Sequence, residues 1–256
     1  MRSENFKNVS KKIQEMWTQS AEGYSRNNNQ ELQSDRKDVW TQAILENAPR
    51  EGKLKVLDIG CGPGEFSILM ALAGHDATGV DLTPAMLEQA RANAKKYNVE
   101  VNFMNMDVQN LEFEDETFDL VIARNVTWNL QDAEGFFKGC QRVLKKGGRI
   151  VYFDANWYLH LYDEEFRKQK EIADAKYEEI YKHESDHSIN NLRSADFADK
   201  LSLSSKRRPD WDRENLPKFG FKVVRIDEDI NERVLEKEGQ IKYASTPMFT
   251  VVGEKE

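Results

Sequence analysis

The stretch VLDIGCGPGEF, residues 56–66, constrains the fold more than any other part of the sequence. An apolar run that ends in an acid predicts a buried strand, and the three glycines after it predict a turn whose backbone approaches a nucleotide. Further apolar runs alternate with helical patterns up to residue 153, which is typical of βαβ units around a parallel sheet. A ligand site is therefore expected at the carboxyl ends of the strands.

The pattern divides this region into strands and helices of ordinary length. The predicted strands are 54–59, 76–81, 100–104, 118–123 and 149–154. Helices are predicted near 65–73, 84–97 and 133–145, and Thr83 and Pro84 suit the start of the second one. Two later apolar runs, 219–224 and 248–254, have no helical pattern between them and are predicted to pair as an antiparallel hairpin with a long connection.

These elements predict an α/β fold: a doubly wound, mostly parallel, seven-stranded Rossmann-like sheet with an antiparallel C-terminal hairpin. Residues 5–48 are predicted to form two polar helices separated by a break at 23–29. After the fifth strand we expect a charged helix at 163–182 and a polar, loop-like segment at 183–210. We therefore divide the chain into a helical cap (1–50), a ligand-binding domain (51–154 and 213–256) and a helical insertion (155–212), a candidate lid.

Charge and cysteine content exclude several function classes. The sequence has 37 basic and 45 acidic residues, and a net charge of −8 disfavours broad binding to nucleic acid or to anionic membranes. The basic cluster 206–208 fits a solvated turn or an anion contact equally well. Cys61 and Cys140 lack metal-ligand spacing, and no apolar run approaches the ~18 residues of a membrane span. We expect a cytoplasmic protein with reduced thiols and no membrane insertion.

The glycine turn does not fit a phosphate site. No GxxxxGK followed by Ser or Thr occurs, and the third glycine of a dinucleotide-binding turn is replaced by Glu65. An acid beside a pyrophosphate would be repelled by it. Asp81, at the end of the second predicted strand, instead suits the two hydroxyls of a ribose, because a carboxylate accepts both hydrogen bonds.

Five motifs resemble, in order and spacing, those of the class I S-adenosylmethionine-dependent methyltransferases: VLDIGCGPG, GVDLTPAML, NMDVQNLEF, FDLVIARNVTWNL and RVLKKGGRI. More narrowly, they resemble the small-molecule group that includes the ubiquinone/menaquinone-biosynthesis C-methyltransferases. The resemblance covers about residues 50–155 and implies S-adenosylmethionine as cofactor. This cofactor carries a sulfonium cation and no phosphate, so acids beside the turn are tolerable.

The resemblance implies a set of cofactor contacts that follow successive strand ends: Asp58, Gly60, Gly62, Gly64, Asp81, Leu82, Met86, Asp107, Val108 and Asn125. It places the glycines against the methionyl and ribose parts, Asp58 at the amino-acid end and Asp81 on the ribose. Leu82 and Met86 would pack around the adenine, and Asp107 would accept from its amino group beside the Val108 amide. Asn125 would border the methyl end. For Asp107 and Asn125, turn formation is the structural alternative.

Tyr24 and Arg26 lie where related small-molecule enzymes fold an N-terminal segment over the cofactor. An arginine there could meet the methionyl carboxylate, and it could equally be a surface residue.

The acceptor side is less constrained, because in-line methyl transfer relies largely on positioning and needs no fixed triad. Asn156, Tyr158 and His160 follow the fifth strand, so we expect them to face the acceptor, with core packing as the alternative. Trp128 and Trp211 are candidate pocket walls or core residues.

No metal is predicted. His183 and His187 have the spacing of a helical metal pair, but the HExxH pattern is missing and a solvated turn is favoured. A strand-end acid, Asp154, lacks an obvious partner acid.

The predicted function is methyl transfer from S-adenosylmethionine to a small-molecule acceptor. RNA or protein methylation and non-catalytic binding of the cofactor stay open as alternatives. The run after the fourth strand, RNVTW, lacks the Asn/Asp-Pro-Pro-aromatic pattern of enzymes that methylate base amino groups, which disfavours nucleic acid. The sequence leaves the oligomeric state open.

Overall fold

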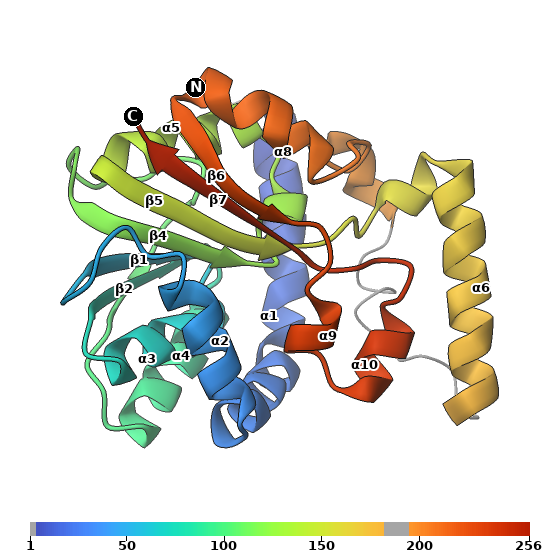
Figure 1. Ribbon diagram of the computed structural model, residues 1–256, viewed down its shortest axis with the longest axis horizontal. Coiled ribbons are helices and arrows are strands. Elements are labelled where there is room, and N and C mark those ends of the chain that lie inside the picture. The colour runs from blue at the N-terminus through green and yellow to red at the C-terminus, as the bar shows by residue number, and fades with distance from the viewer. Residues whose placement is uncertain (1–3, 182–194) are drawn as a thin grey trace.

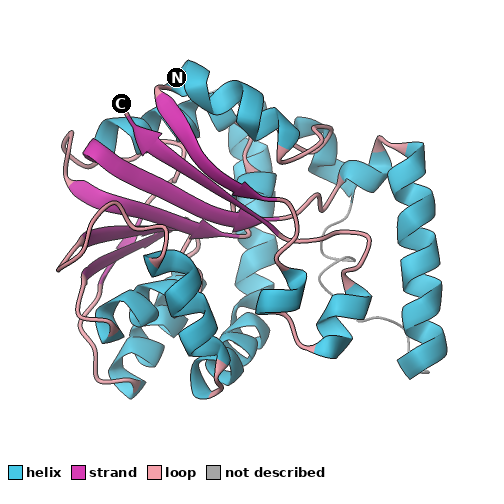
Figure 2. Ribbon diagram, viewed as in Figure 1, coloured by secondary structure: helices cyan, strands magenta, loops and turns pink. Residues whose placement is uncertain are grey.

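The computed structural model describes residues 4–181 and 195–256, and a seven-stranded sheet forms its centre (Figures 1 and 2). The strand order is β3-β2-β1-β4-β5-β7-β6, and β7 alone among these strands runs antiparallel to its neighbours β5 and β6. The strands are β1 (Lys55–Ile59), β2 (Asp76–Asp81), β3 (Asn102–Asn105), β4 (Phe118–Arg124), β5 (Leu144–Asp154), β6 (Phe221–Asp227) and β7 (Phe249–Lys255). The predicted mostly parallel sheet with an antiparallel C-terminal pair is confirmed.

Helices cover both faces of this sheet (Figure 2). The helices are α1 (Glu4–Gln33), α2 (Arg36–Leu45), α3 (Glu65–Leu72), α4 (Pro84–Lys96), α5 (Ala133–Val143), α6 (Glu164–Tyr181), α8 (Asp210–Asn215), α9 (Asn231–Val234) and α10 (Lys237–Lys242). Short 3-10 helices are η1 (Thr127–Asn129), η2 (Leu159–Leu161), η3 (Ala195–Lys200) and η4 (Leu216–Phe219).

The strands β1 and β4 are apolar almost throughout because each buries both faces. On one face Leu120 and Ile122 pack with Ile44 and Ile68 of α2 and α3. Alternate residues of the same strand, such as Val121, join the cluster that α5 covers on the other face. The period-2 pattern thus produces the doubly wound arrangement that the sequence predicts.

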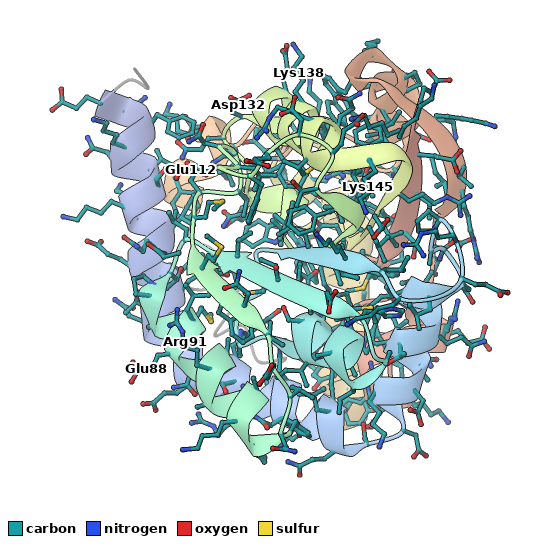
Figure 3. All side chains as sticks on the ribbon, turned by 90° about the vertical axis from the view of Figure 1, so that its left-hand side faces the viewer. Glu88, Arg91, Glu112, Asp132, Lys138 and Lys145 are labelled. Atoms are coloured by element: carbon teal, nitrogen blue, oxygen red, sulfur yellow. The ribbon has the colours of Figure 1, made fainter. Side chains whose placement is uncertain are left out.

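Polar contacts fix the helices at the sheet edges. Asp132 caps α5 by accepting a hydrogen bond from the Gly135 amide at 2.8 Å. On α4, the Arg91 guanidinium donates to the Phe103 carbonyl at 3.1 Å and so ties the helix to β3. Figure 3 shows Glu88 and Arg91 on α4 and Asp132 and Lys138 at α5, with acidic and basic side chains interspersed around the sheet.

The predicted helix break at 23–29 is wrong, because α1 runs unbroken from Glu4 to Gln33. The polar side chains that suggested a loop are used in tertiary contacts. Asn93 of α4 donates to the Ser25 hydroxyl at 3.1 Å, and its carbonyl oxygen accepts from Asn29 at 2.8 Å. These contacts outweigh the low helix propensity of Gly23 and its neighbours.

Two further expectations change in the C-terminal third. The connection between β6 and β7 contains α9 and α10, which at 4 and 6 residues are too short for a helical period to show in the sequence. Within the expected loop at 183–210, the residues from 195 onward include η3. His183 and His187 lie outside the described residues. Within residues 4–181 and 195–256 no helix is both long and apolar enough to cross a membrane.

Candidate active site

A cavity lies at the carboxyl edge of the sheet. It is lined by residues that follow β1, β2, β3 and β4 and by one face of α1. Of the residues predicted to bind the cofactor, its wall includes Tyr24, Asp58, Gly60, Gly62, Asp81, Leu82, Met86, Asp107, Val108 and Asn125. Parallel pairing brings these strand ends together.

The three glycines of the turn have different structural reasons to be glycine. All have positive φ, at 64°, 52° and 89° for Gly60, Gly62 and Gly64. A Cβ on Gly60 would lie 2.5 Å from the Val126 side chain, and one on Gly64 would press on Phe103 and Ala90. At Gly62 it would meet only the Tyr24 ring at 3.9 Å and Met86 Sδ at 4.0 Å among the described residues. Gly62 therefore faces the open cavity, whereas Gly64 serves packing and is absent from the wall.

Asp58 is buried at 2% exposure, and only one of its carboxylate oxygens is satisfied. Oδ2 accepts hydrogen bonds from the Ser67 amide at 2.9 Å and the Ser67 hydroxyl at 2.6 Å. Oδ1 accepts none from the described part of the chain. Burial raises the pKa of Asp58 to about 7, against the hydrogen bonds from Ser67 and the positive charge of Arg124. A cation placed at Oδ1 would favour the ionised form.

The other acids of the wall organise their own turns. Asp81 accepts from the Gly62 amide at 2.9 Å and the Thr83 amide at 2.8 Å, so the end of β2 fixes the glycine turn. Burial raises the pKa of Asp81 against these hydrogen bonds. Asp107 accepts from the Gln109 amide at 2.9 Å. The Asp81 carboxylate retains lone pairs for a ligand, since each oxygen can accept more than one hydrogen bond.

Asn125 combines a strained backbone with an unpartnered side-chain oxygen. Its φ is 57°, its carbonyl accepts from Trp128 Nε1 at 2.8 Å, and its amide donates to the Phe153 carbonyl at 2.9 Å. The side-chain oxygens of Asn125 and of the neighbouring wall residue Asn129 are buried without a hydrogen-bond partner among the described residues. Such groups are costly unless a ligand satisfies them.

Helix α1 lies across this edge of the sheet (Figure 1). Its side chains line the cavity, and we call this helix the roof of the cavity. The residues that it contributes recur at helical spacing: Ser10, Ile13, Trp17, Tyr24 and Asn28. Gln14 donates to the Leu82 carbonyl at 2.8 Å, and Gln131 donates to the Ser10 hydroxyl at 2.8 Å. Asn93 of α4, which contacts Ser25 and Asn29 of α1, also donates to the Pro63 carbonyl at 2.9 Å and so links α1 to the glycine turn. Apart from Tyr24, this stripe was missed from the sequence, although its spacing was a signal.

A buried ion cluster at one end of the cavity was also missed. Arg124, the last residue of β4, donates to Glu31 Oε2 of α1 at 2.8 Å and to Glu65 Oε2 at 2.5 Å. Trp40 Nε1 donates to the same Glu31 oxygen at 3.0 Å. Burial raises the pKa of Glu65 well above its usual range, despite Arg124. Although burial opposes it, Arg124 and a hydrogen bond with Glu65 lower the pKa of Glu31 to about 2.

Asn156, Tyr158 and His160 do not line this cavity. The Asn156 side chain clasps the backbone of Arg208, donating to its carbonyl at 2.7 Å and accepting from its amide at 3.0 Å. Tyr158 is buried against Trp128. His160 lies in η2, and burial lowers the pKa of its imidazole. The structure thus does not bring them to the cofactor residues, and their role toward an acceptor stays a prediction.

Residues of the insertion (155–212) pack against α1. A hydrophobic cluster joins α1, the strand-end segments after β4 and β5, and η3: Val9, Ile13, Met16, Trp128, Tyr158, Phe197, Ala198 and Leu201. Trp128 therefore packs in this cluster, and Trp211 packs with Phe137 and Phe219; neither is part of the cavity wall.

Two of the three residues in the basic cluster 206–208 form ion pairs within the chain. Arg207 pairs with Asp163, and the buried Arg208 pairs with the buried Asp212. Arg26 is exposed and also lies outside the wall. Within residues 4–181 and 195–256 no group of three or more His, Cys, Asp or Glu side chains could hold a metal ion.

Comparison with known proteins finds similarity over the part of the chain that carries most of the site. Residues 57–152 match the family model described as "Methyltransferase domain". Demethylmenaquinone methyltransferase of Tropheryma whipplei is 33% identical over 141 residues, which are 54% of this chain and 57% of that protein. Ubiquinone biosynthesis O-methyltransferase of Coxiella burnetii is 28% identical over 126 residues, 48% of this chain and 53% of that protein. The chain thus matches about half the length of these relatives.

A solved structure of an S-adenosylmethionine-dependent methyltransferase from Mesorhizobium loti has the same fold. It superposes with a TM-score of 0.59 over 86% of this chain and 100% of that one, at 17% identity. At this identity the likeness concerns the fold alone.

Proposed function

Residues 57–152 of this chain form a methyltransferase domain of the class I S-adenosylmethionine-dependent type, and from this premise we propose that the protein methylates a small-molecule acceptor. The prediction of such a domain from five sequence motifs is confirmed. The activity of the whole protein is the proposal, and its single strongest support is the set of side chains that one cavity gathers from four strand ends.

The cavity fits S-adenosylmethionine on structural grounds. Gly62 leaves open space between Tyr24 and Met86, where a side chain would otherwise intrude. Asp58 Oδ1 offers an unsatisfied acceptor for an ammonium group, and Asp81 has lone pairs for the ribose hydroxyls. In this arrangement Leu82 and Met86 pack on the adenine.

When bound, S-adenosylmethionine supplies a methyl group that leaves sulfur by in-line displacement as the acceptor bonds to carbon. The residues of this chain bind the cofactor, orient the donor and the acceptor, and exclude water. The roof formed by α1 shields the reacting centre, which strengthens electrostatic contacts inside and holds donor and acceptor in line. The free side-chain oxygens of Asn125 and Asn129 suit an acceptor that carries O–H or N–H donors.

The acceptor class follows from charge and enclosure. The wall carries the carboxyl groups Asp58, Glu65, Asp81 and Asp107, and its one cationic side chain among the described residues, Arg124, is paired with two glutamates. Such a site favours a neutral or cationic small molecule over RNA. The quinone-biosynthesis names of the relatives suggest ring compounds with hydroxyl groups as the first acceptors to try. Further parts of the proposal are that Asn156, Tyr158 and His160 serve the acceptor and that the protein is cytoplasmic.

The test begins with the purified chain. Mass spectrometry of its denatured supernatant should show a co-purifying adenosyl ligand, and calorimetry should show binding of S-adenosylhomocysteine. Release of S-adenosylhomocysteine is then measured against pooled hydroxylated ring compounds, amines, RNA and protein. Turnover with RNA or protein alone would contradict the proposed acceptor class. Binding without turnover on any pool would favour a non-catalytic cofactor-binding protein.

A further inference from the structure

Arg124 is the cationic side chain of the cavity wall, and its surroundings hold it rigidly. Its guanidinium lies 5.0 Å from the Trp40 ring and 5.1 Å from the Phe66 ring. Its side chain is 11% exposed, and Glu31 and Glu65 lie at hydrogen-bond distance. The wall that includes Arg124 also includes Asp58, Gly60 and Gly62, and the positive charge of Arg124 lowers the pKa of Asp58 against its burial, so a positive and a negative group lie within electrostatic reach of each other in this wall.

The hydrogen bonds of Arg124 leave one edge of the guanidinium unused. Glu65 accepts from the two terminal nitrogens of the guanidinium: Nη2 donates to Oε2 at 2.5 Å and Nη1 donates to Oε1 at 3.5 Å. Glu31 takes the second hydrogen of Nη1. The Nε–H and the second Nη2–H have no partner among the described residues. These two parallel donors form the side edge that binds a carboxylate in two-pronged fashion.

Charge accounting in the cluster also leaves room for an anion. Burial raises the pKa of Glu65 well above its usual range, whereas Arg124 and a hydrogen bond with Glu65 lower the pKa of Glu31 to about 2 against its own burial. Arg124 and Glu31 then cancel each other, and Asp58 contributes negative charge nearby. An α-amino acid is a zwitterion, so its ammonium matches Asp58 and its carboxylate matches the free edge of Arg124, at little net cost in buried charge.

We infer that Arg124 binds the carboxylate at the amino-acid end of the cofactor, while Glu31 and Glu65 hold its guanidinium in place and Asp58 takes the ammonium. This inference rests on the proposed function. It replaces the alternative of Arg26, which is exposed and outside the wall. It also explains why α1 is joined to β4 through Glu31: the roof and the carboxylate contact are set by the same side chain.

The test compares two ligands that differ only in this carboxylate: S-adenosylhomocysteine and its decarboxylated analogue, S-adenosyl-3-thiopropylamine. Calorimetry on the wild-type chain should show a preference for S-adenosylhomocysteine of roughly 10- to 100-fold, as expected for hydrogen bonds between charged groups. In Arg124→Lys, which loses the two-pronged edge, the preference should fall to about threefold or less, while the analogue binds as in the wild type. A merely structural role of Arg124 would weaken both ligands equally.

Three further variants complete the design. Arg213→Lys makes the same change at a surface position and should leave the affinity ratio of S-adenosylhomocysteine to its decarboxylated analogue unchanged. Arg26→Lys tests the rival arginine, and a collapse of the ratio there overturns the inference. Glu31→Gln serves if Arg124→Lys does not fold: with one competing negative charge removed, the ratio should rise severalfold, and an unchanged ratio contradicts the inference. If the wild type binds both ligands equally, the inference fails and the proposed function stands. If it binds neither, both fail.

Discussion

Asp58 and Asp154 are two buried aspartates near the carboxyl ends of neighbouring regions of one sheet, yet they are satisfied very differently. Within the described residues Asp154 accepts four hydrogen bonds: from the Ala155 amide and Trp157 Nε1 on Oδ1, and from the Thr127 hydroxyl and the Trp128 amide on Oδ2. Asp58 accepts two from the same part of the chain, both on one oxygen.

The same difference separates the two regions around these residues. At the end of β5, Thr127, Arg208 and Asp212 continue a closed network, with Arg208 donating to Thr127 at 3.0 Å and Tyr152 donating to Asp212 at 2.5 Å. At the glycine turn, acceptor atoms and backbone are left free beside a cavity. In this chain the Asp154 carboxylate is thus used in structure, whereas the half-saturated carboxylate of Asp58 keeps an acceptor oxygen for a ligand.

The largest effect, on the free energy of unfolding, is expected from a variant that breaks the closed network. Arg208→Met should lower the free energy of unfolding by about 3–5 kcal/mol, because it leaves the buried Asp212 carboxylate unpaired. Its exposed neighbour offers a matched control: Arg207→Met removes the surface pair with Asp163 and should cost less than about 1 kcal/mol. Urea unfolding of both variants measures this. Equal losses would mean that the network does not carry the stability of this region.

The glycine turn should respond in binding more than in stability. Gly62→Val forces a β-branched side chain into positive φ and into the space between Tyr24 and Met86, so affinity for S-adenosylhomocysteine should fall by more than ~100-fold. Gly74→Val is the matched control, since Gly74 has a φ of 89° but open space around a Cβ. Both variants should lose about 1–2 kcal/mol of stability from backbone strain. Normal binding by folded Gly62→Val would place the ligand elsewhere.

The half-saturated state of Asp58 predicts a pH dependence. With a pKa of about 7 in the free protein, Asp58 is largely protonated at pH 6, and a bound ammonium group favours its ionised form. Affinity for S-adenosylhomocysteine should therefore rise about tenfold from pH 6 to pH 8. The ligand-free protein should change in the opposite sense: because the folded pKa lies above the unfolded value, stability is lost as pH rises from about 4 through 7.

Calorimetry across this pH range checks the binding prediction, and Asp58→Asn, which cannot titrate, is the control. A wild-type profile as flat as that of the variant would show that Asp58 does not contact a cationic part of the ligand.

The smallest effect on cofactor affinity is expected from a substitution of His160. Since His160 lies in η2 outside the cavity wall, His160→Ala should change the affinity for S-adenosylhomocysteine by less than about twofold. Once an acceptor is known, the kinetic constants decide its role: lower kcat indicates a contact in the transition state, and a raised KM indicates acceptor binding. A tenfold loss of cofactor affinity would erase the distinction between the two regions.

The two regions also differ in how well the sequence predicts them. The cofactor edge depends on local rules, such as glycines at positive φ and acids directly after strands, and these leave marks such as GCGPG and Asp81 in the sequence. The mostly parallel, doubly wound sheet followed from the alternating pattern. The Glu31–Arg124 contact joins residues 93 positions apart, and no local pattern encodes it.

The misread segments have the same origin. The stretch 23–29 resembles a loop because its Ser and Asn side chains are used in contacts with Asn93, which only the folded chain supplies. For Asn156 the sequence supplied only a position after the fifth strand: its hydrogen bonds to the Arg208 backbone join residues 52 positions apart and could not be foreseen, and its role toward an acceptor stays a prediction.

The insertion of β7 between β5 and β6 has a consequence for the order in which the chain can assemble during synthesis. The five parallel strands and every strand-end residue of the cavity are made by residue 154, so this part of the sheet can pair as it leaves the ribosome. In a chain that ends at residue 240, β6 has no neighbour to pair with, because its partner β7 begins at Phe249. Such a chain should therefore protect the backbone of β1 and β4 from hydrogen exchange while β6 stays unprotected.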